Sequence, residues 1–323
     1  MVMGAKNVLK VVLDAHAGER VLIVSDIQKE DICKAFEKGA KELGANVVTY
    51  LLPEEERPLK EVPHELAKLV ASNHIVINAF SGRGEETPFR IKLIKLETAS
   101  KARVGHAPGI SKEMMTDGPM NANYEEVAKN AEKVIDLFKD AEWVRITTDK
   151  GTDILLYIEG REFSSDVKIK SGTFGNLPAG EVWCAPVEDA ANGIIIVDGS
   201  IGDIGQVKKE LKIEVKNGRI TKLETEDKEL LKRVTELLEI DDEAKVIGEL
   251  GIGLNPRARI SGNLLEDEKA GRTAHIAFGN NEDMVGGRNR SKTHRDFLFH
   301  RPTMEVTYKN GSKVTVIKDG IVL

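Results

Sequence analysis

The tripeptide His294-Arg295-Asp296 combines residue types that bind metal ions. If this segment is a strand, residues two apart point to the same face, so the imidazole and the carboxylate converge. A nitrogen and an oxygen donor together suit zinc, manganese, cobalt or iron better than calcium. The alternative is an exposed ion pair of Asp296 with Arg295 or Lys292, because so short a motif also occurs by chance.

A third candidate ligand is His275, in the segment TAHIAFGNN. It begins an alternating apolar run that includes Ile276 and Phe278, which predicts a strand entering the core. A histidine at the head of a buried strand is either a metal ligand or a polar group with an ordinary hydrogen-bond partner.

Two glutamates lie in surroundings too apolar for a surface carboxylate. Glu181 lies in NLPAGEVWCAP, and Glu249 lies in the glycine-rich run KVIGELGIGLNP. A buried carboxylate must be paired, protonated or bound to a metal, because burying it bare costs several kcal/mol. The alternative for Glu249 is a salt bridge to Arg257 or Arg259.

Several other site classes find no support. The glycine patterns in GELGIGLNP and in GSIGDIG (199–205) do not lie between a parallel strand and a helix, so they predict no dinucleotide site. The motifs GxxxxGK[ST] and GxSxG are absent. Cys33 and Cys184 are too few for a disulfide framework, and the apolar surroundings of Cys184 predict a buried thiol.

Composition narrows the class of protein further. The 323 residues correspond to two domains, at about 150 residues each. The net charge of −6 and the lack of a basic stripe predict no nucleic-acid partner. The N-terminus lacks a secretory signal and no apolar run could span a membrane, so we expect a cytoplasmic protein. The many Lys, Glu and Arg residues and only two Gln predict a heat-adapted, thermophilic source.

The periodicity of the chain divides it into two halves. Short β-branched runs alternate with amphipathic helical segments over the first half, which predicts an α/β domain with a parallel sheet over residues 1–135. A long helix is expected over 123–141. Alternating strands with Asn-Gly turns at Asn217 and Asn310 follow, so residues 136–323 are expected to form an α+β domain rich in antiparallel strands that carries the metal site.

Four blocks of the second half, read in order, resemble one known family. These are GNLPAGEVWCAP, IGELGIGLNP, DEKAGRTAHIAFGNN and GGRNRSKTHRDF, over residues 171–299. They look like the aminopeptidase T/aminopeptidase S type of thermophilic metallopeptidases. The resemblance implies an N-terminal α/β domain, a metal-carrying C-terminal domain, peptide substrates and a homodimer.

The resemblance also implies roles for single residues. Glu249 would bridge two metal ions and so take part in catalysis, and Glu181, His275, His294 and Asp296 would be the other ligands. Apart from the resemblance, we expect Asn289 and Ser291 to orient His294, and Glu268 or Glu282, which lie near His275 in the sequence, to act as the general base. The function implied is a metallo-aminopeptidase in which two ions, zinc, cobalt or manganese, produce a metal-bound hydroxide that attacks the N-terminal peptide bond.

Two alternatives stay open. The 2,5-dihydroxypyridine dioxygenases look like the same fold, and in an enzyme of that type His275, His294 and Asp296 would hold one Fe(II) ion. A relative that binds without catalysing is the other alternative. The family usually has a tyrosine a few residues after the histidine that matches His275, but this chain has Asn, Asn, Glu, Asp and Met at 280–284.

Overall fold

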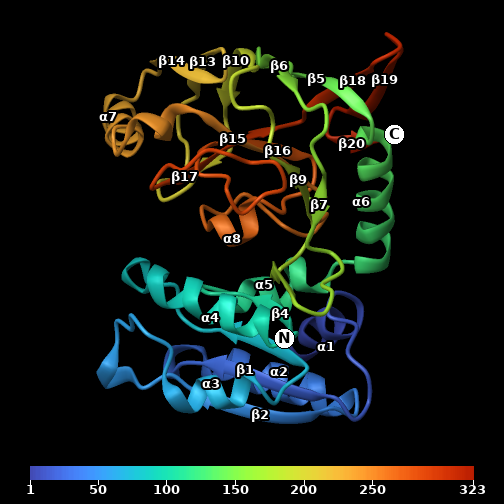
Figure 1. Ribbon diagram of the computed structural model, residues 1–323, viewed down its shortest axis with the longest axis vertical. Coiled ribbons are helices and arrows are strands. Elements are labelled where there is room, and N and C mark those ends of the chain that lie inside the picture. Colours follow the sequence, from blue (N-terminus) through green and yellow to red (C-terminus); the bar gives the residue numbers. More distant parts are fainter. The chain divides into compact units, whose positions relative to one another are not determined.

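The computed structural model describes all residues, 1–323, and divides them into two compact units (Figure 1). The first unit comprises Met1–Ala128 and Asp166–Gly180, and the second comprises Lys129–Ser165 and Glu181–Leu323. A parallel sheet in the first unit and antiparallel sheets in the second confirm the predicted fold class. The predicted division after residue 135 did not include the return of 166–180 to the first unit, and that boundary stays a prediction.

The first unit is built on a five-stranded parallel sheet with the strand order β2-β1-β3-β4-β8. Its strands are β1 (Arg20–Ser25), β2 (Asn46–Leu51), β3 (Ile75–Ala79), β4 (Arg103–His106) and β8 (Thr173–Asn176). Its helices are α1 (Val2–Val11), α2 (Glu30–Glu42), α3 (His64–Val70), α4 (Thr87–Ala99) and α5 (Lys112–Thr116). The strands and helices expected in this half are present, but sequence reasoning missed α1, α5 and β8.

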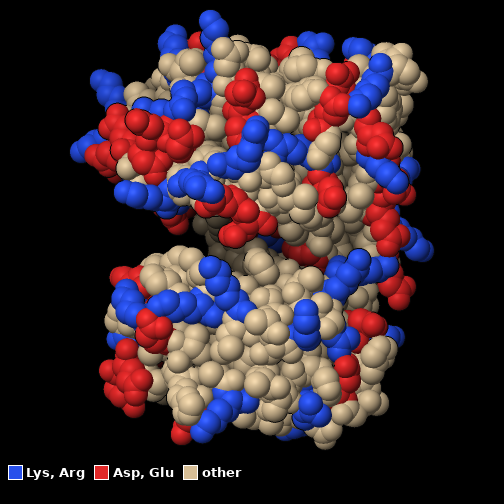
Figure 2. Space-filling model, in the orientation of Figure 1, with Lys and Arg blue, Asp and Glu red and all other residues tan.

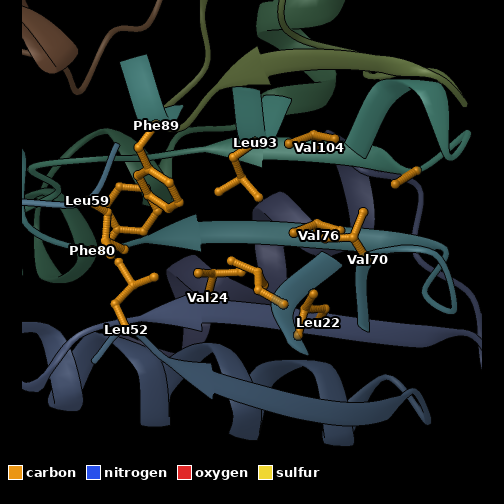
Figure 3. Close-up of a cluster of buried hydrophobic side chains, with 12 residues drawn as sticks. Leu22, Val24, Leu52, Leu59, Val70, Val76, Phe80, Phe89, Leu93 and Val104 are labelled. Atoms are coloured by element: carbon orange, nitrogen blue, oxygen red, sulfur yellow. The ribbon is translucent and has the colours of Figure 1, made fainter. Parts of the chain in front are cut away.

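An apolar cluster holds α3 and α4 against this sheet (Figure 3). Val76 from β3 and Val104 from β4 meet Val70 from α3, and Phe89 and Leu93 from α4, all fully buried. Strands of a parallel sheet are covered on both faces, which is why every residue of β3 is buried, rather than every second one.

One antiparallel sheet of the second unit has eight strands in the order β14-β13-β10-β6-β5-β18-β19-β20. Its strands are β5 (Ala141–Thr147), β6 (Asp153–Tyr157), β10 (Asn192–Val197), β13 (Leu211–Lys216), β14 (Arg219–Glu224), β18 (Thr303–Tyr308), β19 (Lys313–Lys318) and β20 (Ile321–Val322). The predicted hairpin at Asn217 joins β13 to β14, and both Asn217 and Gly218 have positive φ, as a type I′ turn requires.

The other sheet of the second unit has seven strands in the order β12-β11-β17-β16-β15-β9-β7. Its strands are β7 (Ser164–Ser165), β9 (Glu181–Cys184), β11 (Ser200–Ile201), β12 (Gly205–Gln206), β15 (Ile247–Gly253), β16 (Thr273–Gly279) and β17 (His294–His300). The remaining helices are α6 (Tyr124–Phe138), within the expected 123–141, α7 (Lys228–Leu238) and the short α8 (Leu264–Asp267). All five predicted metal ligands belong to this sheet.

Charged side chains of both signs are mixed over the visible surface of each unit, without a continuous basic stripe on that face (Figure 2). No helix has both the length and the apolar character needed to cross a membrane.

Candidate metal centre

Four adjacent strands present the predicted ligands on one face of the seven-stranded sheet. Side chains alternate between faces along a strand, so His294 and Asp296 of β17 share the face that carries His275 of β16. Glu249 of β15 and Glu181 of β9 lie on the same face by cross-strand register. The opposite face is apolar and includes Phe278 and Phe297. Their rings pack edge to face, with ring centroids 5.7 Å apart.

The strand register sets which polar side chains become neighbours. Glu249, Ala277 and Asp296 are aligned across β15, β16 and β17, and the small side chain of Ala277 separates the two carboxylates. His275 lies opposite Gly251, and Glu181 lies opposite Gly253. Residues far apart in the sequence therefore become neighbours on one patch of sheet.

Four of the five side chains form a tight cluster. The Nε2 atom of His275 lies 3.5 Å from Oε1 of Glu249 and 3.9 Å from Oδ1 of Asp296. The Nε2 atom of His294 lies 3.0 Å from the other oxygen of Glu249, Oε2, and 3.4 Å from Oδ1 of Asp296. Each oxygen of Glu249 thus faces a different imidazole.

Glu181 joins this cluster at its edge. Its Oε2 atom lies 3.9 Å from Nε2 of His275, whereas its Oε1 atom lies 2.6 Å from Nζ of Lys269. Lys269 also contacts Oε2 of Glu268 at 2.7 Å. Sequence reasoning missed Lys269, because a lysine in the charged segment EDEK looks like part of a solvated loop.

Two glycines of β15 make room for these groups. A Cβ atom on Gly251 would lie 2.0 Å from Nε2 of His275, so only glycine leaves space for that ring. A Cβ atom on Gly253 would lie 2.1 Å from the carbonyl oxygen of Ala270, next to Lys269. The glycine pattern of GELGIG thus has a steric cause within the cluster.

A backbone carbonyl orients His294. The carbonyl oxygen of Asn280 lies 2.7 Å from Nδ1 of His294, and because a carbonyl can only accept, Nδ1 must be the donor. In the neutral ring, the lone pair then lies on Nε2, which faces Glu249 and Asp296. This is the arrangement that a histidine ligand needs.

Asn289 and Ser291 do not hydrogen-bond to His294. The Asn289 amide donates to the carbonyl of Glu243, and the Ser291 hydroxyl donates to Asp241. Their connection to His294 runs through the loop backbone, because the side chain of Asn280 donates to the Ser291 carbonyl. The carbonyl of Asn280 was not foreseen, because a backbone group leaves no signal in residue types.

The charges of the cluster shift the pKa values of its members strongly. Burial favours the neutral imidazole of His275, but the neighbouring Glu249, Asp296 and Glu181 outweigh this and raise its pKa to about 9. The pKa of His294 also rises despite burial, because of the charge of Asp296. Burial would raise the pKa of Glu249, but His275 and His294 lower it below its usual range. The carboxylates are thus held ionised, as metal ligands must be.

The donor set fits a divalent transition metal. Ligand atoms of Glu249, His275 and Asp296 lie within 4.8 Å of one another, so one ion could contact all three. Oδ1 of Asp296 is buried without a hydrogen-bond partner, although burial of such an atom is costly. Imidazole nitrogens and carboxylate oxygens suit zinc, cobalt, manganese or iron.

The cluster opens to solvent on one side. The side chain of His294 is 31% exposed, whereas those of Glu249, His275 and Asp296 are 8% exposed or less. A small molecule would therefore reach the ligand atoms along His294.

Comparison with known proteins identifies the family. A model of the family described as thermophilic metalloprotease (M29) matches residues 109–322, about two thirds of the chain. The chain belongs to this family. The predicted enzyme class, a metal-dependent hydrolase of peptide bonds, and the suspected family are thereby confirmed. No curated protein sequence matches the chain significantly.

Two solved structures share the fold of this M29 family member. The 2,5-dihydroxypyridine dioxygenase from Pseudomonas putida matches with a TM-score of 0.78 and 17% identity, over 100% of this chain and 96% of that chain. Wild-type AmpT from Thermus thermophilus matches with a TM-score of 0.72 and 17% identity, over 100% of this chain and 98% of that chain. At such identities these likenesses concern the fold alone.

Proposed function

We propose that this M29 family member is an aminopeptidase whose metal ligands are Glu181, Glu249, His275, His294 and Asp296. The family supports metal-dependent peptide hydrolysis. The observation that carries the ligand set is the convergence of Glu249, His275 and Asp296 within 4.8 Å, with Nε2 of His294 directed at the same carboxylates. Cleavage at the N-terminus of a peptide is supported by the resemblance of the four sequence blocks.

The finer part of this proposal is a centre with two ions, zinc, cobalt or manganese, bridged by Glu249. The support is geometric, because one oxygen of Glu249 faces His275 and the other faces His294. When bound, such ions polarise the peptide carbonyl and lower the pKa of water. Asn289 and Ser291 would act on His294 only indirectly, by holding the loop that carries Asn280.

The chain offers one glutamate to move protons beside this centre. Glu268 touches Lys269 next to Glu181, and its side chain is only 16% exposed. Burial raises the pKa of Glu268 above its usual range and the charge of Asp296 adds to this, against the lowering effect of Lys269, so its carboxylate is a better proton acceptor than an exposed glutamate. Glu282, the other candidate, pairs with Arg290 at the surface. Glu268 is therefore the proposed general base.

Replacing the bridging carboxylate tests this function. We expect Glu249→Ala to lose bound metal and hydrolysis of leucine p-nitroanilide together, because two imidazoles lose their shared partner. Glu305→Ala, on β18 of the other sheet, is the matched control, since Glu305 makes only an exposed pair with Lys313. Metal is counted by mass spectrometry on protein purified without chelator. Unchanged metal content in Glu249→Ala would contradict the bridging role.

The second candidate is a ring-cleaving dioxygenase that holds one Fe(II) ion. The fold likeness to the 2,5-dihydroxypyridine dioxygenase favours it, as does the two-histidine, one-carboxylate set of His275, His294 and Asp296. One iron per chain, with oxygen uptake on a dihydroxylated ring, would support this candidate. Two zinc, cobalt or manganese ions with peptide turnover would support the aminopeptidase. Peptide binding without turnover under any divalent metal would indicate an inactive relative.

A further inference from the structure

Lys269 is a completely buried lysine beside the proposed ligands. Its side chain is 0% exposed, and its ammonium contacts Oε1 of Glu181 at 2.6 Å and Oε2 of Glu268 at 2.7 Å. Lysine is almost never buried to this extent unless it is paired. A fixed positive charge thus lies against a carboxylate that is itself a proposed metal ligand.

The backbone holds this lysine in place. The amide of Asn255 donates to the carbonyl of Lys269 at 2.9 Å, and the amide of Gly271 donates to the carbonyl of Asn255 at 2.8 Å. The close approach of this segment depends on Gly253, where a Cβ atom would lie 2.1 Å from the Ala270 carbonyl oxygen. These contacts fix the position of the Lys269 ammonium beside the proposed ligands.

Glu181 lies between this ammonium and the metal-binding cluster. Its Oε1 atom is held by Lys269, and its Oε2 atom lies 3.9 Å from Nε2 of His275. A divalent ion at Glu249, His294 and Asp296 would use ligands that Lys269 does not touch, whereas the ion next to His275 is the one that Glu181 would bind. An ion bound at Glu181 would share a carboxylate with a positive charge.

The charges of the centre also favour binding of a first divalent ion over binding of a second. Glu181, Glu249 and Asp296 supply negative charge, and Lys269 cancels part of it before any ion binds. A first divalent ion removes most of the remainder. A second ion then meets both the first ion and the ammonium at short range, where like charges repel strongly in a buried site.

We propose that the Lys269 ammonium competes with the second divalent cation for Glu181, so that the centre binds one ion tightly and the second ion weakly. This inference rests on the ligand set of the proposed function. It makes Lys269 a residue that sets metal occupancy, and Glu181 a ligand whose use depends on it.

Replacing the ammonium by a neutral chain of similar length tests the proposal. We expect Lys269→Met to raise the affinity for the second ion at least about tenfold, because a nearby positive charge is removed. The affinity for the first ion should rise by less. Equilibrium dialysis against zinc, cobalt or manganese chloride, with the bound metal counted by mass spectrometry, measures both affinities without any assay of activity. A merely structural role of Lys269 would weaken binding and would not strengthen it.

Lys212→Met is the matched control. Lys212 also bridges two glutamates, Glu214 at 3.1 Å and Glu224 at 3.0 Å, but on the outer eight-stranded sheet. Its replacement should leave both affinities unchanged. The double variant Glu181→Gln/Lys269→Met should lose the gain, because the contested carboxylate is gone.

The possible results separate this inference from the proposed function. Unchanged or weaker binding of the second ion in Lys269→Met overturns the competition while leaving the proposed function intact. If circular dichroism shows that Lys269→Met does not fold, Lys269→Gln removes the same charge and is held to the same result. Wild-type protein that binds no divalent ion at all overturns both.

Discussion

Gly251→Ala is a perturbation whose effect can be worked out from the structure. The new Cβ atom would lie 2.0 Å from Nε2 of His275 and 2.1 Å from Cε1. Ordinary van der Waals contact begins at 3.4 Å, so the ring must retreat by about 1.4 Å. Metal–nitrogen bonds tolerate only about 0.2 Å of variation. The atom that moves most is therefore the one proposed to bind metal.

The size of the effect follows from this displacement. A ligand moved by about 1 Å in a catalytic site costs on the order of 100-fold in rate, which is about 2.7 kcal/mol of transition-state stabilisation. We expect Gly251→Ala to lower kcat/KM for leucine p-nitroanilide by about 100-fold and to weaken metal affinity at least about tenfold. Metal affinity is measured by competition with a chromophoric chelator.

Two further variants separate this effect from general damage. Gly84→Ala is the neutral control, because no atom lies within 4 Å of its added Cβ. In the background His275→Ala, which removes the ring, Gly251→Ala should cause no further loss of metal affinity. The reasoning is refuted if Gly251→Ala alone keeps metal affinity within about threefold of wild type, against the tenfold loss expected.

Two further predictions concern the stability of the first unit. Both tryptophans, Trp143 and Trp183, lie in the second unit, so tryptophan fluorescence would not report on the first. Hydrogen exchange of the amides in β3 and α4 measures its stability instead. Burial raises the pKa of Glu97 to about 8 and lowers that of His106 to about 3, from ordinary values of 4.5 and 6.5. Between pH 4.5 and 6.5 the proton that Glu97 takes up on folding offsets the proton that His106 releases, so stability changes little with pH. Above pH 6.5 only Glu97 exchanges a proton on folding, and its contribution to stability is lost as pH rises towards 8. The free energy of opening of the first unit should fall by about 2 kcal/mol between pH 6.5 and 8. Glu97→Gln should abolish this fall. An equally steep fall in Glu97→Gln would contradict the role of Glu97. The Arg57 guanidinium lies 2.5 Å from the carboxylates of both Asp26 and Glu86, so Arg57→Met leaves two buried carboxylates without their arginine partner. This variant should destabilise the first unit by about 3–5 kcal/mol. A loss below about 1 kcal/mol would show that water reaches the two carboxylates.

Much of the candidate site could be predicted from the types of its residues and their spacing in the sequence. The alternation of side chains along a strand was enough to bring His294 and Asp296 to one face, and the structure places both on β17. Glu249 could be predicted as a site residue because a carboxylate in an apolar run needs a partner. The alternative to a metal ligand was a salt bridge to Arg257 or Arg259, whereas the structure directs the oxygens of Glu249 at His275 and His294.

The remaining features depend on register between strands, which a single sequence does not specify. The opposition of Gly251 to His275 exists only because β15 and β16 pair with a shift between Ile247 and Glu249. The contact of Lys269 with Glu181 likewise joins residues 88 positions apart. Local periodicity carries no information on such pairings.

The same reason explains what was missed in the fold. The strand β8 pairs with β4 in parallel, but it follows β5 and β6, which belong to the second unit. A chain that leaves a unit and returns to it has no signal in local composition. The helix α1 was also missed, although its buried residues Ala5, Val8 and Leu9 have the spacing of one helix face.

The central claim is that the side chains on one face of the seven-stranded sheet bind metal ions. A crystal structure of protein purified without chelator, with anomalous diffraction recorded at the zinc, cobalt, manganese and iron edges, tests it most directly. We predict a strong peak within bonding distance of Glu249, His294 and Asp296, and a weaker second peak beside His275 and Glu181. A metal-loaded crystal with no anomalous peak among these side chains would contradict the account.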